Sequence, residues 1–302
     1  MKTMKFFGLM LVVALTFASC KKDDDSSEET TTPTNTPKVI FKFVFDEDQE
    51  RLDNFGNPST VPAGHAAQTP VFNKISAHYL EMIQNQLTQL GEGEVLYKAP
   101  ETTAGGDNAI DFDQSILVGE NEAFLQVPIS AIDPGTYTFL RASLAYQNYD
   151  IDFTTNILGT DYDLTGTLAS FVGFNTYITD YTVNTSSLVV NDDKLQGYWG
   201  FEANVLGSNY LTSGQAPAGA TTVPNPLFAT SPIPAGSCVV TGEFQEPLVI
   251  TGNETSDIVV ILSLSCNQSF EWVDGNANGK YEPSLGENVV DMGLRGLVPY
   301  VE

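Results

Sequence analysis

The sequence is poor in basic residues, histidine and cysteine. Its 302 residues include 13 Lys and Arg against 38 Asp and Glu, which gives a formal net charge of −25. Because a surface this acidic repels phosphate backbones, electrostatic binding of nucleic acid is not expected. Two His and three Cys leave little material for a transition-metal or thiol enzyme. Hydrophobic residues make up 42% of the chain, so a buried core of ordinary size is expected.

The first twenty residues have the pattern of an export signal. Lys2 and Lys5 precede an apolar run from Phe6 to Phe17, which is too short to span a bilayer. Small residues then lead to Cys20. This segment resembles a bacterial lipoprotein signal, and the resemblance implies removal of residues 1–19 and acylation of Cys20. An uncleaved helical anchor is the alternative.

Residues 20–37 are expected to form a flexible acidic tether. Lys21 and Lys22 are followed by a run of Asp, Ser and Glu and then by Thr and Pro, a composition typical of disorder. Fully extended, residues 21–37 could reach roughly 55–60 Å. The basic-then-acidic cluster after Cys20 resembles the surface-export signal of Bacteroidota lipoproteins. That resemblance implies an outer-membrane protein facing the cell exterior, with a periplasm-facing lipoprotein as the alternative.

Residues 38–302 are expected to form one all-β domain, an antiparallel β-sandwich of the Ig-like or Greek-key type with long loops. The signal is short alternating apolar runs broken by Gly, Asn, Asp and Pro. Strands are predicted at 39–46, 122–129, 137–153, 182–190, 195–205, 239–244, 248–251, 257–272 and 291–297.

Three segments carry predictions beyond these strand bounds. Residues 72–90 fit either a helix or a strand, and we favour a strand at 74–83. Residues 207–234 lack periodicity and are predicted to form a long exposed loop. Within 137–153, alternation predicts that four side chains share one face: Leu140, Ala142, Leu144 and Tyr146.

Cys238 and Cys266 remain once Cys20 is acylated. An even pair of cysteines in an exported protein is a candidate disulfide. Closing this loop would stabilise the fold by roughly 3–4 kcal/mol in the loop-entropy model. Two buried free thiols are the alternative, and neither cysteine has the surroundings of a nucleophile.

Residues 274–287 resemble a calcium-binding loop. Oxygen ligands at loop positions 1, 3 and 5 would come from Asp274, Asn276 and Asn278, and Gly279 would allow the sharp turn at position 6. Further ligands would be the Lys280 carbonyl and the carboxylates of Glu282 and Glu287. Position 12 is Leu285 instead of Glu, so that Glu287 would act from a lengthened loop. A turn that binds nothing is the alternative to this structural Ca²⁺ site.

His65 and His78 are the only histidines, and together with nearby carboxylates they could hold copper or zinc. Unrelated histidines are the alternative. The chain has no Gly-x-Ser-x-Gly elbow, no His-Glu-x-x-His motif and no phosphate-binding glycine loop. A non-enzymatic protein is therefore expected.

Three further segments are similar to a known family. They are 39–43 (VIFKF), 72–80 (FNKISAHYL) and 134–141 (PGTYTFLR), where a Pro-Gly turn leads into a strand. In this order they resemble the MbnP-like copper-binding family of Bacteroidota lipoproteins. The resemblance covers roughly residues 38–153 and implies a β-sandwich and, in some members, extracytoplasmic copper binding.

Three functions are compatible with these features. The first is a surface-exposed outer-membrane lipoprotein that serves as a subunit or accessory of an outer-membrane protein complex in transport, secretion or membrane-protein assembly. The second is a lipoprotein that binds copper, haem or a glycan, in which exposed aromatic residues such as Trp199 and Tyr210 would matter. The third is a hydrolase with paired carboxylates, for which no particular pair stands out.

Overall fold

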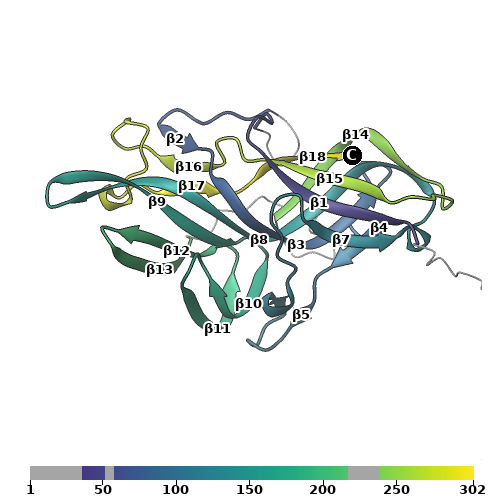
Figure 1. The fold of residues 1–302 in the computed structure, drawn as a ribbon, viewed down its shortest axis with the longest axis horizontal. Coiled ribbons are helices and arrows are strands. Elements are labelled where there is room, and N and C mark those ends of the chain that lie inside the picture. Colours follow the sequence, from purple (N-terminus) through teal and green to yellow (C-terminus); the bar gives the residue numbers. More distant parts are fainter. Residues whose placement is uncertain (1–35, 52–57, 217–237) are drawn as a thin grey trace, which may run out of the picture. The chain divides into compact units, whose positions relative to one another are not determined.

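The computed structural model describes residues 36–51, 58–216 and 238–302. Cys20, the signal peptide and nearly all of the predicted tether lie outside the described residues. Thr36–Glu302 form one compact unit (Figure 1). Within the described ranges no helix is long and apolar enough to cross a membrane.

The described chain is almost entirely β-structure and forms a β-sandwich, as the sequence predicts. The large sheet has the strand order β13-β12-β9-β8-β3-β4, with β14 also paired to β8. Its strands are β3 (Val71–Ile83), β4 (Glu94–Lys98), β8 (Gly135–Ile157), β9 (Thr160–Phe171), β12 (Tyr198–Val205), β13 (Ser208–Gln215) and β14 (Cys238–Ile250).

Three smaller sheets pack against the large sheet. The terminal sheet, in the order β18-β15-β1-β7, contains β1 (Lys38–Asp46), β7 (Ala123–Pro128), β15 (Ile258–Ser265) and β18 (Arg295–Val301). The lower sheet, in the order β11-β10-β6-β5, contains β5 (Glu101–Thr102), β6 (Ala109–Asp111), β10 (Asn175–Thr182) and β11 (Ser187–Leu195). The small sheet, in the order β17-β16-β2, contains β2 (His65–Gln68), β16 (Phe270–Val273) and β17 (Val289–Met292). Three short 3₁₀ turns complete the elements: η1 (Phe112–Gln114), η2 (Ile129–Ala131) and η3 (Pro283–Leu285).

Most strand pairs are antiparallel, as expected of the predicted sandwich, but two pairs are parallel. β1 runs parallel to β15, with Val39 opposite Ile258, and β10 runs parallel to β6, with Thr176 opposite Ile110. Parallel neighbours need long connections. More than 200 residues separate β1 from β15, so this pair is not joined by a hairpin, which would make the strands antiparallel.

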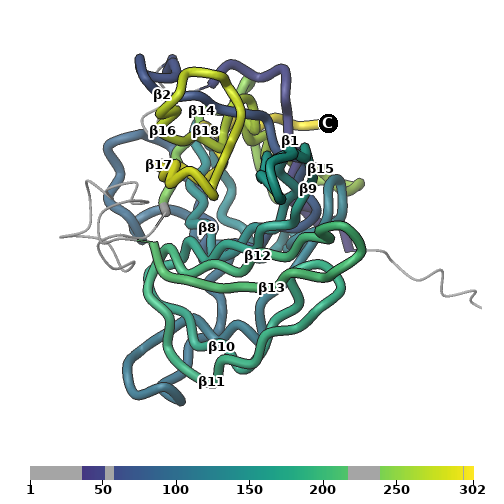
Figure 2. Tube along the Cα trace, turned by 90° about the vertical axis from the view of Figure 1, so that its left-hand side faces the viewer, coloured from purple at the N-terminus to yellow at the C-terminus, as the bar shows by residue number. Residues whose placement is uncertain are grey.

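The hydrophobic core has three main parts, one under each smaller sheet. The terminal sheet and the large sheet enclose the largest cluster, which includes Phe41, Phe43, Leu140 and Leu262. The lower sheet packs on residues such as Phe171, and the small sheet packs on Tyr149 and its neighbours. Figure 2 shows β10 and β11 on one side of β12 and β13, with β16 and β17 on the other side.

A β-bulge in β8 decides which face its residues occupy. Pairing with β3 passes from Ser76–Tyr146 directly to Ala77–Leu144, so Ala145 is the extra residue. A bulge reverses the alternation of the side chains that follow it. Leu144 therefore packs under the terminal sheet, whereas Tyr146 packs against the lower sheet. The prediction that Tyr146 shares a face with Leu140, Ala142 and Leu144 is wrong for this reason.

Several predicted strand bounds are also corrected. The preferred strand at 74–83 is confirmed, because β3 covers it. The predicted strand 182–190 is interrupted between β10 and β11, and 257–272 is divided between β15 and β16. Residues 208–215 of the predicted loop form β13, paired along its whole length with β12, and 217–234 lie outside the described residues. β9 was not predicted, because its Gly- and Thr-containing sequence has no clear period.

Candidate functional site

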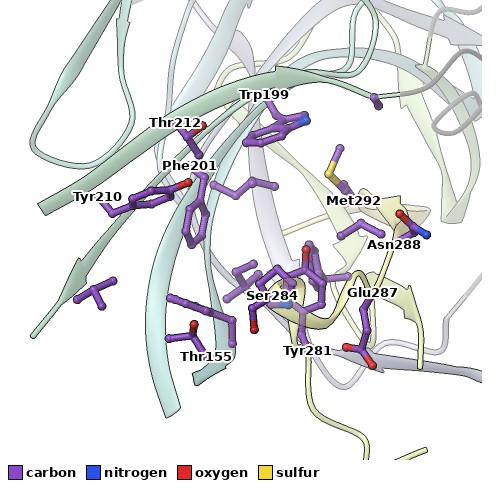
Figure 3. A pocket seen from close by; sticks show the side chains of 18 of the residues that line it. Thr155, Trp199, Phe201, Tyr210, Thr212, Tyr281, Ser284, Glu287, Asn288 and Met292 are labelled. Carbon is purple, nitrogen blue, oxygen red and sulfur yellow. The ribbon is translucent and has the colours of Figure 1, made fainter. Parts of the chain in front are cut away.

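A large cavity lies between the large sheet and the small sheet. Its volume is about 1200 Å³. β8, β9, β12 and β13 form one wall, and β16, β17 and the segment 281–288 form the other. The side chains that face it are mostly aliphatic or aromatic (Figure 3): Ile151, Phe153, Ile157, Leu168, Trp199, Phe201, Val205, Tyr210, Phe270, Tyr281, Val289, Val290 and Met292.

Period-two alternation places the rings of β12 on this wall. Trp199 and Phe201 point into the cavity, and Glu202, between Phe201 and Ala203, points to the opposite face of the sheet. Two glycines leave the space that these rings occupy. A Cβ on Gly214 would lie 2.6 Å from the Trp199 ring, and a Cβ on Gly166 would lie 2.4 Å from the Phe201 ring. Larger residues at either position would push the rings into the cavity.

Contacts between aromatic rings stabilise the inner wall of the cavity. Phe153 packs edge-on against Phe201 with ring centroids 5.4 Å apart. Tyr281 contacts Phe270 at 5.2 Å and Trp272 at 5.6 Å. Burial, and secondarily the nearby Glu287 carboxylate, raises the pKa of Tyr281 to about 12. The phenol is therefore neutral at physiological pH.

The described lining of the cavity presents no free charge. Among the described residues that line it, Glu287 is the only charged one. Its Oε1 accepts a hydrogen bond from Gly275 N at 3.3 Å, and its Oε2 accepts one from Glu282 N at 2.7 Å. In Figure 3 the carboxylate is directed away from the rings of Phe201 and Trp199. The polar groups available to a ligand are thus neutral hydroxyls and amides, among them Thr155, Thr212, Ser284 and Asn288.

The predicted calcium loop forms the part of the cavity wall that carries Tyr281 and Glu287. Asp274 accepts hydrogen bonds from Asn278 N at 3.3 Å and Gly279 N at 2.8 Å. The Oδ1 atoms of Asn276 and Asn278 accept the amides of Asn278 and Lys280 at 3.2 and 2.8 Å. Gly279 has a φ of 74°, the left-handed conformation predicted for its sharp turn. The loop residues are therefore brought together.

The Glu282 carboxylate accepts hydrogen bonds from both asparagines of this loop. The Nδ2 atoms of Asn276 and Asn278 each donate to its Oε2 at 2.6 Å. In the parts of the chain that the structure describes, no group of three or more His, Cys, Asp or Glu side chains is arranged to hold a metal. Three of the six candidate Ca²⁺ ligands are the side-chain oxygens of Asn276 and Asn278 and the backbone carbonyl of Lys280. A group defined by His, Cys, Asp and Glu side chains does not include them.

The loop is attached to the β8–β9 hairpin. Lys280 Nζ binds the Asp163 carboxylate at 2.9 and 3.1 Å. This hydrogen bond, the one from Thr154 and the positive charge of Lys280 lower the pKa of Asp163. Thr154 N donates to the Tyr281 carbonyl at 2.7 Å. The Lys280 side chain thus serves to connect the loop to the hairpin.

The two histidines have separate partners. His65 on β2 contacts Glu271 on β16 at 2.5 Å, and Glu271 also pairs with the buried Arg51. His78, the extra residue of a bulge in β3, binds Glu101 on β5 at 3.1 Å. Burial lowers the pKa of His78, although Glu101 acts in the opposite direction. Each imidazole thus bonds a different carboxylate, and a joint copper or zinc site stays a prediction.

The predicted disulfide is not present. Cys266 is a free thiol in the cluster under the terminal sheet, and burial raises its pKa to about 11. Cys238 begins β14, whose backbone at that point pairs with Leu144 of the large sheet. Cys266 directly follows β15, and its thiol packs in the hydrophobic cluster under the terminal sheet.

Sequence reasoning identified only part of the cavity. Trp199 and Tyr210, proposed as ligand-binding aromatics, both line it. The sequence predicts Ile151 and Phe153 only as part of the strand 137–153, and Ile157 lies beyond the predicted end of that strand. Their common orientation could have been found from the sequence, but the opposite wall could not, because β17 lies more than 100 residues away. Comparison with family models, with curated proteins and with solved structures returned no match for this chain.

Proposed function

We propose that this chain is a non-enzymatic, lipid-anchored outer-membrane protein, facing the cell exterior, that binds a neutral and largely apolar small molecule. The observation that carries the proposal is the cavity of about 1200 Å³ with its aliphatic and aromatic lining. Concave, mostly apolar sites with a few polar groups are the usual form of small-molecule sites. The anchor at Cys20 and the location rest on the sequence of residues 1–37.

The electrostatics of the lining favour a neutral ligand. No Lys or Arg is among the described residues that line the cavity, and both oxygens of Glu287 accept backbone hydrogen bonds. A carboxylate or phosphate would therefore be buried without a counter-ion, which is costly. This argues against haem, whose propionates would lack cationic partners, and the lining in the described part of the chain has no His or Cys to hold the iron.

Copper and glycan ligands also fit the cavity less well. Copper would need soft or imidazole ligands, and both histidines are bonded to carboxylates elsewhere. A glycan carries hydroxyl groups on every side. Ile151, Leu168 and Met292 on the inner wall have no polar group with which to satisfy them, and an unsatisfied hydroxyl is expensive to bury. An elongated aliphatic or polycyclic molecule suits the lining better.

A role as an accessory subunit of an outer-membrane protein complex remains the second hypothesis. It is compatible with ligand binding, because a carrier can hand its ligand to a partner. Among the described residues no surface singles out a protein partner, so the cavity carries more weight.

The loop 274–287 is proposed to hold a structural Ca²⁺ ion. Its carboxylate, amide and carbonyl oxygens are the ligands that Ca²⁺ prefers. Because Tyr281 and Glu287 belong to both the loop and the cavity wall, ion binding would also stabilise that wall.

Titration with N-phenyl-1-naphthylamine tests the cavity. This neutral dye becomes more emissive in apolar surroundings, and we expect saturable binding with one molecule per chain. Val205→Arg places a cation in the cavity from a half-buried position at its edge, and should weaken binding at least about tenfold.

Val189→Arg is the matched control. Val189 is also a strand valine but is 74% exposed on β11, away from the cavity. Absence of saturable dye binding to the unsubstituted protein would refute the proposal, and so would equal weakening by the two arginine substitutions.

A further inference from the structure

Two hairpins beside the cavity have leucine where a turn disfavours it. The β8–β9 turn contains Leu158 with a φ of 51° followed by Gly159, and the β12–β13 turn contains Leu206 with a φ of 51° followed by Gly207. Such turns prefer Asn, Asp or Gly, because a side chain in the left-handed region is strained. The other non-glycine residues with positive φ among the described residues are small or polar: Asn121, Asn191, Gln268 and Ala277.

These leucines also lack contacts that would explain them. Leu158 is fully exposed and Leu206 is 60% exposed. Core packing therefore does not compensate for the strained conformation. A bulky apolar residue at an exposed, strained turn is costly for both folding and solubility, and its occurrence in two neighbouring hairpins points to a surface function.

The two tips lie at one end of the cavity. Ile157 and Val205, which directly precede the leucines, line the cavity, and so does Ser208. Leu285 of η3 is 63% exposed and follows the lining residues Pro283 and Ser284. Figure 1 shows the β8–β9 hairpin, the ends of β12 and β13 and the loop before β17 at the same end of the fold. Leu158, Leu206 and Leu285, which we call the rim leucines, thus border the part of the lining that reaches solvent.

We infer that the rim leucines insert into the surface of a lipid bilayer and that the cavity takes its ligand from that bilayer. This inference rests on the proposed function, because a membrane is the natural source of a neutral apolar ligand. The tether predicted for residues 20–37 supports a lipid surface as the occupant, since its reach of roughly 55–60 Å would keep the domain close to the membrane that holds Cys20.

The charge around the rim leucines defines the kind of bilayer. Asp161 follows the β8–β9 tip in the chain and Glu282 precedes η3, while Lys280 is paired with Asp163. A negative rim is repelled by anionic headgroups. We therefore expect docking on zwitterionic lipid, and weaker docking when anionic lipid is added.

Depth-dependent fluorescence quenching tests the inference on the full chain. Leu158→Trp and Leu206→Trp report from the rim, and Leu87→Trp is the matched control. Leu87 is 82% exposed and follows β3, whose Ile83 pairs with Phe139 near the other end of β8. Bromine atoms on the acyl chains of phosphatidylcholine vesicles quench tryptophans that insert. The emission that a rim tryptophan adds to that of the two native tryptophans should fall by about half, because inserted side chains reach the acyl boundary. The control should lose none.

Each outcome bears on a different statement. Equal quenching of all three proteins, or of none, overturns membrane docking, whereas stronger quenching after phosphatidylglycerol is added overturns the preference for zwitterionic lipid. A blue shift of the rim tryptophans that grows with protein concentration without vesicles would mean that a second copy covers the rim, which also overturns membrane docking. Dye binding in vesicle-free solution is independent: if it persists without quenching, only the docking inference fails, and if quenching occurs without dye binding, only the cavity proposal fails.

Discussion

The buried carboxylate of Glu202 provides a quantitative test of the structure. Glu202 lies on β12, on the face opposite the cavity, and connects that strand to the turn between β10 and β11. Its Oε2 accepts hydrogen bonds from the amides of Asn184, Thr185 and Ser186, each at 3.0 Å. Its Oε1 accepts the hydroxyls of Thr185 and Ser186 and, at 3.2 Å, the Nδ2 of Asn209. Asn209 lines the cavity, so this network also positions β13.

These hydrogen bonds change the pKa of Glu202. Burial alone would raise it, but the donors of Thr185, Ser186 and Asn184 outweigh burial and lower it from 4.5 to about 2. At about 1.4 kcal/mol per pKa unit, this difference corresponds to about 3 kcal/mol of stability. Allowing for partial screening by solvent around the turn, we expect Glu202→Gln to lower the free energy of unfolding at pH 7 by about 2 kcal/mol.

The sign of the pH dependence follows from the lowered pKa. Above pH 4.5 the carboxylate is ionised in both states, and the full contribution is present. As the pH falls from 4.5 towards 2, the unfolded chain binds a proton that the folded chain does not, so the contribution decreases. The difference between the unsubstituted protein and Glu202→Gln should therefore fall to less than half between pH 7 and pH 3.

Urea unfolding followed by tryptophan fluorescence measures this difference at each pH. Glu243→Gln is the control, because Glu243 is an exposed glutamate on β14. Its substitution should change the free energy of unfolding by less than about 0.5 kcal/mol. A Glu202→Gln effect that matches the control at pH 7, or that is the same at pH 7 and pH 3, would refute the account of this carboxylate.

Two further predictions concern the loop and the hairpin tips. Chelation with EGTA should lower the melting temperature of the unsubstituted protein by a few degrees, since a site with a dissociation constant near 0.1 mM at millimolar Ca²⁺ contributes about 1.4 kcal/mol; Asp274→Ala should respond much less, and an equal response would show that Asp274 is not a ligand. Leu158→Asn should raise the free energy of unfolding by about 0.5–1 kcal/mol in urea titrations, because asparagine accepts the φ of 51° more readily than leucine. A lower stability would contradict the assignment of strain to this turn.

The strained leucines and the apolar cavity have a common consequence for stability. Residues that favour folding at these positions, such as asparagine at the tips, would remove apolar surface that the proposed function uses. Stabilising substitutions at a functional surface commonly reduce activity for this reason. The same Leu158→Asn substitution that strengthens the fold is therefore expected to weaken docking on phosphatidylcholine vesicles.

Local patterns in the sequence predicted many of the strands and some of the site. The alternation of β1 and the choice of a strand at 74–83 are confirmed, because period two is a property of neighbouring residues. Trp199 and Tyr210 were identified as ligand-binding candidates from their type alone. The calcium-type loop at 274–287 stays a prediction from turn chemistry that is also local, and Gly279 has the left-handed conformation expected of it.

Alternation and composition by themselves determined that this chain is an acidic, β-rich protein with strands of alternating polarity. Only the tertiary structure decided which apolar faces meet, because strand pairing joins residues far apart in the chain and leaves no local signal. The bulge at Ala145 sends Tyr146 to the face opposite Leu144, and Cys238 begins β14 of the large sheet whereas Cys266 follows β15 of the terminal sheet. The same long-range pairing places β17 across from β12, which creates a cavity that neither strand indicates alone.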